Sequence, residues 1–227
     1  MIVVVGLAFE ARIAAGAGIR VICSGDGRNL PDALEASIAL GRCGLVSFGV
    51  AGGLASELRP GSCIVASEVL DGERRLPTHY AWSQRLLRMH PGAVYGALVG
   101  VSAPVAEPAH KRTLHRKTGG VAVDTESHIV ARAAAAHGLP MVAIRVVTDP
   151  AHRVLPQAAL VGVRPDGTTN VAAVLRSLLR RPHDIPALVR VALDTRVARS
   201  ELLRGRQLLG PPSLGISDLS QLELDVA

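Results

Sequence analysis

The sequence predicts an α/β protein: a single-domain, three-layer α/β/α fold with a central mixed, mostly parallel twisted sheet. Apolar runs alternate with segments of helical periodicity over most of the 227 residues. Several runs are continuously apolar, which is typical of strands that are buried on both faces. Hydrophobic residues make up 48% of the chain and aromatic residues only 2%, so the core must consist mainly of aliphatic side chains.

The order of elements follows from the local sequence. Runs rich in β-branched residues predict strands, and apolar residues recurring every three or four positions predict helices. The expected strands are residues 2–7, 19–24, 45–50, 63–70, 94–101, 121–123 and 141–147. The expected helices are residues 10–17, 30–41, 79–90, 109–117, 127–137, 169–181 and 185–204.

The chain shows no internal repeat and no linker that would divide it. Residues 1–206 are therefore predicted to form one domain, and residues 207–227 to form a C-terminal tail. The middle strands, 63–70 and 94–101, are expected to be arranged like a β-meander, which would make the sheet mixed.

Positive charge is concentrated in the last third of the chain. The net charge is +6, and residues 151–206 contain ten Arg but only four acidic residues. This pattern fits either solvated Arg-rich helix faces or an anionic partner such as a membrane surface. The last predicted helix carries an apolar stripe, so packing on the sheet edge and peripheral membrane contact are both open. The stripe consists of Ile185, Leu188, Val189, Ala192 and Leu193.

Other features set the expected location and exclude some partners. The scarcity of aromatic residues argues against nucleic-acid binding by base stacking. The N-terminus has no basic signal-peptide region, and no uncharged apolar run approaches the roughly 18 residues of a spanning helix. Three cysteines outside any C-x-x-C pair indicate a reducing compartment. We expect a cytoplasmic protein, with association to a membrane as the open alternative.

Three acidic residues lie where predicted strands end. Asp149 closes an apolar run before Pro150, which cannot continue a strand ladder. Glu10 follows the first strand, and Glu126 follows the strand at 121–123. Because ligands bind at the carboxyl ends of strands in open α/β sheets, these acids are candidates for catalysis.

Each acid also has a purely structural explanation. Asp-Pro commonly starts a turn, which would explain Asp149. Glu10 would be favoured in the first turn of a helix by the helix dipole, and Asp124 would cap the helix that follows it.

The segment Gly49-Val-Ala-Gly-Gly53 is predicted to be a loop after a buried strand. Its glycines would let the backbone approach a ligand and offer N–H groups, although a tight turn explains them equally. No metal site is predicted, because His110 and His115 are five residues apart and do not share a helix face. No G-x-S-x-G nucleophile motif is present.

Four motifs in this order resemble one superfamily. They are Gly6-Leu-Ala-Phe-Glu10, Gly49-Val-Ala-Gly-Gly-Leu54, Val123-Asp-Thr-Glu-Ser127 and Arg145-Val-Val-Thr-Asp149. Over roughly residues 1–180 the chain resembles the purine nucleoside phosphorylases and the methylthioadenosine/adenosylhomocysteine nucleosidases. The stretches GLAFEARIA and SFGVAGGL are most similar to the hopanoid-associated phosphorylases of bacteria, which are implicated in removing adenine from adenosylhopane.

The resemblance implies a role for each matching residue. Asp149 corresponds to the acid that protonates purine N7, Glu126 to the glutamate that binds the ribose hydroxyls, and Glu10 to the glutamate that deprotonates the attacking water. Arg145 corresponds to an arginine beside the nucleophile. Thr125 and the segment Gly49, Val50, Ala51 and Gly52 correspond to residues that contact the substrate.

Two positions depart from the family pattern. Val50 stands where Ser or Thr usually helps to bind water or phosphate, and Thr125 stands where Met is usual. The nucleophile therefore stays open, since Arg145 with Arg12 or Arg28 would suit phosphate. The closer resemblance slightly favours phosphorolysis.

The resemblance implies an enzyme that releases adenine from an adenine nucleoside with a bulky apolar 5′ substituent such as hopane. It implies no cofactor, with phosphate as an alternative co-substrate, and it implies a homo-oligomer. One alternative is hydrolysis of methylthioadenosine or adenosylhomocysteine. Another, from a different class, is a non-catalytic protein on the same scaffold that binds nucleosides or a membrane surface.

Overall fold

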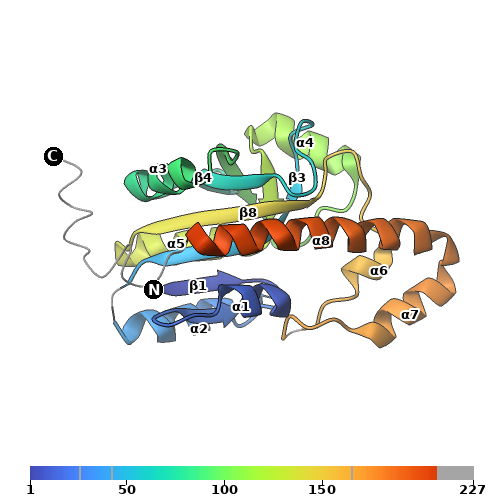
Figure 1. Ribbon diagram of the computed structural model, residues 1–227, viewed down its shortest axis with the longest axis horizontal. Helices are drawn as coiled ribbons and strands as arrows, with labels where there is room; N and C mark the ends of the chain where they lie inside the picture. The colour runs from blue at the N-terminus through green and yellow to red at the C-terminus, as the bar shows by residue number, and fades with distance from the viewer. Residues whose placement is uncertain (26, 42, 165, 209–227) are drawn as a thin grey trace.

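A mixed sheet of eight strands forms the middle layer of the protein (Figure 1). The computed structural model describes residues 1–208 except residues 26, 42 and 165. Five strand pairings are parallel and three are antiparallel, so the predicted mixed, mostly parallel sheet is confirmed. The strands are β1 (Ile2–Val5), β2 (Arg20–Cys23), β3 (Leu45–Gly53), β4 (Cys63–Asp71), β5 (Arg74–Pro77), β6 (Val94–Gly100), β7 (Ala122–Asp124) and β8 (Met141–Asp149).

Five of these strands form a closed circuit of pairings. β3 pairs with β8 along its length and with β7 at its carboxyl end, while β4 pairs with β8 and β6, and β6 with β7. β1 and β2 extend the sheet beside β3, and β5 extends it beside β4. The predicted meander is wrong: β4 and β6 are parallel, because β5 and a helix carry the chain back between them.

Helices cover both faces of the sheet. The face packed by α2 and α5 takes Ile2 and Val4 of β1, whereas the face packed by α1, α3 and α8 takes Val3 and Val5. This alternation follows from the two-residue period of a strand, and it confirms the three layers. The helices are α1 (Ala8–Ala14), α2 (Leu30–Ala39), α3 (Tyr80–Met89), α4 (Pro108–Thr118), α5 (Ser127–His137), α6 (Gln157–Leu160), α7 (Val171–Arg180) and α8 (Ile185–Leu208), with a 3-10 turn at Pro182–Asp184.

Glycines in a left-handed conformation follow two of the helices. Gly119 follows α4 with φ 72° and Gly138 follows α5 with φ 59°, a left-handed conformation that side chains disfavour. The predicted helix at 10–17 instead begins at Ala8 and ends at Ala14. Sequence patterns missed β5 and α6, which have only four residues each.

The C-terminal third contains the two helices that were expected there. α7, α6 and the beginning of α8 project from one end of the sheet, and the rest of α8 lies across it (Figure 1). α8 continues to Leu208, beyond the predicted end of the domain. The predicted tail falls mostly on residues 209–227, which lie outside the described residues. None of the described helices is both long and apolar enough to cross a membrane.

Candidate active site

A cavity of about 710 Å³ opens where β1, β3, β7 and β8 end. Seven of the predicted site residues line it, and Gly49 and Arg145 lie directly beside it. The seven are Glu10, Val50, Ala51, Gly52, Thr125, Glu126 and Asp149. A second cavity of about 540 Å³, between β1, β2 and α2, has no acidic residue in its lining.

Glu10 is buried in the first turn of α1 and faces back toward β1. Its Oε2 accepts hydrogen bonds from the backbone N–H groups of Gly6 (2.9 Å) and Leu7 (2.8 Å), and its Oε1 from that of Val50 (2.7 Å). Burial raises the pKa of Glu10 to about 7, while Arg145 opposes that shift. A helix dipole explains the first-turn position but not the burial, whereas a carboxyl that ionises near neutral pH suits a general base.

Arg145 is fully buried at the centre of β8. Its Nε donates to Oδ2 of Asp124 (2.5 Å), and its Nη2 donates to Oγ of Ser47 (2.7 Å) and Oε2 of Glu126 (3.3 Å). These bonds fix the guanidinium below the cavity, between β3 and β7. Ser127 accepts a further hydrogen bond from Nη2 (3.2 Å).

Gly49 allows Arg145 and Glu10 to approach the backbone of β3 closely. A Cβ atom at this position would lie 2.8 Å from Nη1 of Arg145 and 2.6 Å from Oε1 of Glu10. Nη1 is buried and has no hydrogen-bond partner among the residues that the structure describes. Oε1 of Glu10 and the unused Nη1 donor of Arg145 thus lie on the same side of Gly49, and a buried donor without a partner is a place where an ordered water molecule can bind.

The glycine-rich segment is not the predicted loop. It belongs to β3, which stays paired with β8 as far as Gly52 opposite Asp149, with an irregularity after Ala51. The absence of side chains at Gly49 and Gly52 makes room for the acids on neighbouring elements, since a Cβ at Gly52 would lie 3.1 Å from Oδ2 of Asp149. Val50 contributes its backbone N–H to Glu10.

Glu126 and its neighbours lie at the start of α5. Oγ1 of Thr125 donates to Oε1 of Glu126, whose carboxylate lies against Gly6. Oδ1 of Asp124 accepts from the backbone N–H groups of Glu126 (3.1 Å) and Ser127 (2.8 Å), so Asp124 binds N–H groups at the start of α5, although the N-cap residue itself is Glu126. Asp124 also binds Arg145, which the sequence did not indicate.

Carboxyl groups outnumber cations around Arg145. Burial lowers the pKa of Arg145, but Asp124, Glu126 and Glu10 raise it above its ordinary value. Burial raises the pKa of Glu126, and Arg145 opposes this. One arginine shared by three carboxyl groups gives a site that favours a positive charge developing nearby and disfavours a bound anion.

Asp149 has a partner that sequence reasoning missed. Lys111 of α4 is fully buried, and its Nζ lies 2.6 Å from Oδ2 of Asp149. The same ammonium donates to the backbone carbonyls of Pro150 (3.2 Å) and Arg153 (3.2 Å). Burial raises the pKa of Asp149, whereas Lys111 and a hydrogen bond from Thr148 lower it.

Removing the Lys111 ammonium should destabilise the protein in a pH-dependent way. In Lys111→Met, Asp149 would be a buried carboxylate without its cation, and breaking a buried pair costs roughly 3 kcal/mol. Asp149 can escape this cost by taking up a proton, so the free energy of unfolding should fall more at pH 8 than at pH 5. Urea denaturation at both pH values measures the difference.

The double variant Lys111→Met/Asp149→Asn provides the control for this prediction. It removes both charges and should recover most of the stability that Lys111→Met loses at pH 8. Equal losses in the single and double variants would show that the lysine acts only through its packing.

The signals for the missed residues were weak. Lys111 is one of many polar residues in α4, and only its spacing of three from the half-buried Leu114 places it on the inner face. Ser47 interrupts the apolar run of β3, which marks a buried polar group but not its partner.

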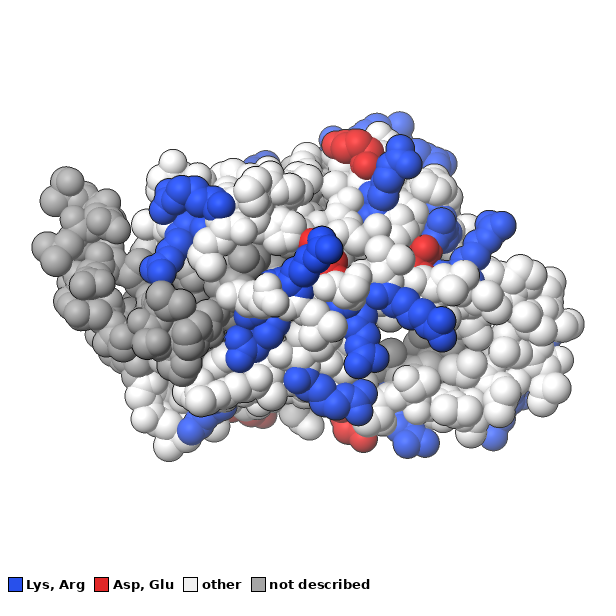
Figure 2. Space-filling model, in the orientation of Figure 1, with Lys and Arg blue, Asp and Glu red and all other residues white. Residues whose placement is uncertain are grey.

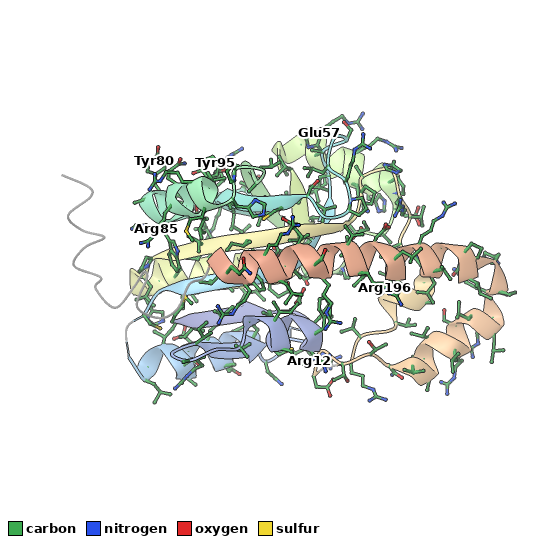
Figure 3. All side chains as sticks on the ribbon, in the orientation of Figure 1. Arg12, Glu57, Tyr80, Arg85, Tyr95 and Arg196 are labelled. Atoms are coloured by element: carbon green, nitrogen blue, oxygen red, sulfur yellow. The ribbon has the colours of Figure 1, made fainter. Side chains whose placement is uncertain are left out.

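Of the arginines considered for phosphate, Arg28 lines the cavity, and Arg12 is exposed on α1 (Figure 3). No three His, Cys, Asp or Glu side chains are grouped to hold a metal within the described residues.

Comparisons with known proteins bear on the family and on the fold. The family model described as the phosphorylase superfamily matches residues 5–180. No curated protein matches the sequence. Among solved structures, the methylthioadenosine/adenosylhomocysteine nucleosidase of Neisseria meningitidis in complex with methylthio-immucillin-A is 15% identical, with a TM-score of 0.66 over 92% of this chain and 97% of that one.

Two Helicobacter pylori enzymes are also similar. A mutant of the methylthioadenosine/adenosylhomocysteine nucleosidase with 5′-methylthioadenosine in its active site is 13% identical, with a TM-score of 0.64 over 92% of this chain and 95% of that one. Futalosine hydrolase is 16% identical, with a TM-score of 0.60 over 79% of this chain and 96% of that one. At these identities the structural likeness bears on the fold alone.

Proposed function

The chain belongs to the phosphorylase superfamily of enzymes, and from that premise we propose that it cleaves the N-glycosidic bond of an adenine nucleoside by hydrolysis. The observation that carries the proposal is the placement of three buried acids, Glu10, Glu126 and Asp149, around one cavity with Arg145 beneath it. Two of the similar structures hold 5′-methylthioadenosine or a methylthio-immucillin, which supports an adenine nucleoside as the ligand.

Asp149 is proposed to donate the proton that lets the purine leave. Breaking the bond sends electrons into the base, and a proton delivered at N7 neutralises the resulting anion. Burial helps Asp149 hold that proton, and Lys111 stabilises the carboxylate that remains after its transfer. The surroundings of Asp149 therefore suit both its protonated form before the transfer and its carboxylate form after it.

Glu126 and Glu10 are proposed to act on the sugar side. The departing base leaves an oxocarbenium-like ribosyl group, and carboxylates near it stabilise its positive charge. Glu126 would accept hydrogen bonds from the ribose hydroxyls. Glu10 would take the proton of a water molecule held beside Gly49, with Nη1 of Arg145 as the second partner of that water.

The charge balance supports water rather than phosphate as the nucleophile. A phosphate dianion next to Arg145 would meet Glu10, Asp124 and Glu126 around an arginine that is already shared. The closer resemblance in sequence slightly favours phosphorolysis, whereas the carboxyl groups around Arg145 support hydrolysis.

Adenine release in the absence of phosphate tests the nucleophile. With 5′-methylthioadenosine as the probe, we expect the same rate in phosphate-free buffer as after addition of phosphate, with the free sugar as the second product. A reaction that needs phosphate and yields the sugar 1-phosphate would contradict hydrolysis but not bond cleavage. Saturable nucleoside binding without any adenine release would instead favour a non-catalytic binding protein.

The 5′ substituent is proposed to be bulky and apolar, as in adenosylhopane. The wall of the cavity next to α6 supports this, because it is formed by the apolar side chains of Leu155, Ala159, Leu160 and Val163. Methylthioadenosine and adenosylhomocysteine are the alternative substrates, and the nucleosidases among the similar structures support them. We further propose that the enzyme needs no cofactor, works as a homo-oligomer and acts in the cytoplasm or at a membrane surface.

A further inference from the structure

α7 presents an apolar stripe to the solvent. Val171, Leu175 and Leu179 are spaced four residues apart, so they lie along one face of the helix. Their exposures are 59%, 56% and 85%. No residue of α7 is buried, so the rest of the described chain covers this helix only in part.

α8 continues this pattern in its first half. Ile185, Val189, Leu193 and Val197 are also four residues apart, and each is between 48% and 53% exposed. Of the stripe predicted from sequence, Leu188 is half-buried on the inner side. Packing on the sheet explains only the second half of α8, where Ala198 and Leu202 are buried in the core. We call the two exposed stripes together the α7–α8 face.

Exposed arginines border the α7–α8 face. Arg176 and Arg180 follow Leu175 and Leu179 directly, and Arg190 follows Val189. One residue corresponds to 100° around a helix, so these side chains lie beside the apolar stripes rather than within them. Basic side chains lie along α8, among them Arg196, and the projecting end is largely uncharged in this view (Figures 2 and 3). Arg199 is a further exposed arginine of this helix.

Two of the three acidic residues near the face, Asp194 and Glu201, are paired. Asp194 forms an ion pair with Arg153, and Glu201 lies 2.6 Å from Nε2 of His90. Asp184 lies 3.6 Å from Nε2 of His183. The positive charge bordering the apolar stripes therefore has few acidic neighbours to offset it.

We propose that the α7–α8 face docks on an anionic membrane. Apolar side chains along one stripe and arginines beside it are the arrangement by which a helix lies in the lipid interface: the apolar stripe enters the acyl boundary, and the cations meet acidic headgroups. The charge complementarity selects lipid over a second copy of the chain. A two-fold contact would bring Arg176, Arg180 and Arg190 of both copies into one interface, where few acidic side chains could offset their charge.

The face adjoins the entrance of the proposed active site. α6 packs against both α7 and α8, and its side chains Ala159 and Leu160 line the cavity. Docking would thus bring the apolar wall of the cavity toward the bilayer, where a nucleoside with an apolar anchor resides. This last step rests on the proposed function, whereas the docking itself does not.

Co-sedimentation of the full chain with vesicles tests the docking. We expect binding to vesicles of phosphatidylcholine and phosphatidylglycerol in equal parts, weaker binding as salt is added, and much weaker binding to phosphatidylcholine alone. Leu175→Asp/Leu179→Asp should reduce binding at least tenfold, and Arg176→Gln/Arg180→Gln should weaken it and its dependence on salt. Leu40→Asp is the matched control, because Leu40 is 72% exposed after α2, and it should bind like the unaltered protein.

Two results would overturn the proposal. One is equal sedimentation of the α7 variants and the Leu40→Asp control. The other is a dimer that becomes a monomer in Leu175→Asp/Leu179→Asp without any vesicle binding, which would assign the face to a second copy. Adenine release from soluble 5′-methylthioadenosine, measured without vesicles, should be the same in all these proteins. A loss of docking is thereby separated from a failure of the proposed activity.

Discussion

Asp149→Asn is expected to release adenine at least about 100-fold more slowly than the unaltered enzyme, because an amide cannot deliver the proton that the leaving purine needs. The loss should appear in kcat, since the proton is needed only as the bond breaks. Initial rates of adenine release at saturating substrate measure it. Asp32→Asn, which changes an exposed acid on α2, should leave the rate unaltered.

A second substrate separates the chemical role of Asp149 from a structural one. A nucleoside whose purine is already methylated at N7 carries the positive charge before the bond breaks and needs no proton. Asp149→Asn should cleave it at close to the rate of the unaltered enzyme. If the variant cleaves both nucleosides equally slowly, Asp149 is not the acid, and its pairing with Lys111 serves the fold.

Glu10→Gln is expected to reduce turnover by two orders of magnitude or more, because the amide cannot take a proton from water. The pKa of Glu10 near 7 adds a pH signature. Only the ionised carboxylate can act as the base, so kcat/KM of the unaltered enzyme should rise about tenfold per pH unit on the acid side of pH 7. Glu57→Gln, an exposed acid (Figure 3), should keep that profile.

Ionisation of Glu10 should raise the activity but lower the stability of the folded protein. The pKa of Glu10 is raised from 4.5 to about 7 in the folded protein, so the folded state holds this proton more tightly than the unfolded chain. Its contribution to stability is fully present below pH 4.5 and is lost as the pH rises through 7. Activity and folding stability should therefore change in opposite directions over this range. A pH-independent rate would remove Glu10 from the role of the base.

Much of the site could be predicted because its acids lie at strand ends. Asp149 and Glu10 directly follow apolar runs, and strand ends meet at one edge of a parallel sheet. The residues that tune these acids were harder to find. Lys111 reaches Asp149 from α4, 38 positions earlier, and nothing in a polar helix indicates which lysine turns inward.

The errors in the fold also have physical causes. Glycines within 49–53 suggested a loop, but the ladder with β8 continues through them because backbone pairing needs no side chains. The circuit formed by β3, β8, β4, β6 and β7 depends on pairings between distant segments, which local periodicity does not report. The four-residue elements β5 and α6 are too short to show a period.

The closed circuit of strands limits how this molecule can move. A strand at the edge of an open sheet can fray, but β3 and β8 are each held by neighbours on both sides. Opening one ladder leaves the strand fixed by the other, so the spacing between Gly49 and Arg145 cannot widen by local breathing. Any opening of the cavity must then come from segments around its rim, such as α6, whose Ala159 and Leu160 line it. The paired strands therefore keep Gly49 and Arg145 in a fixed position while the rim can move.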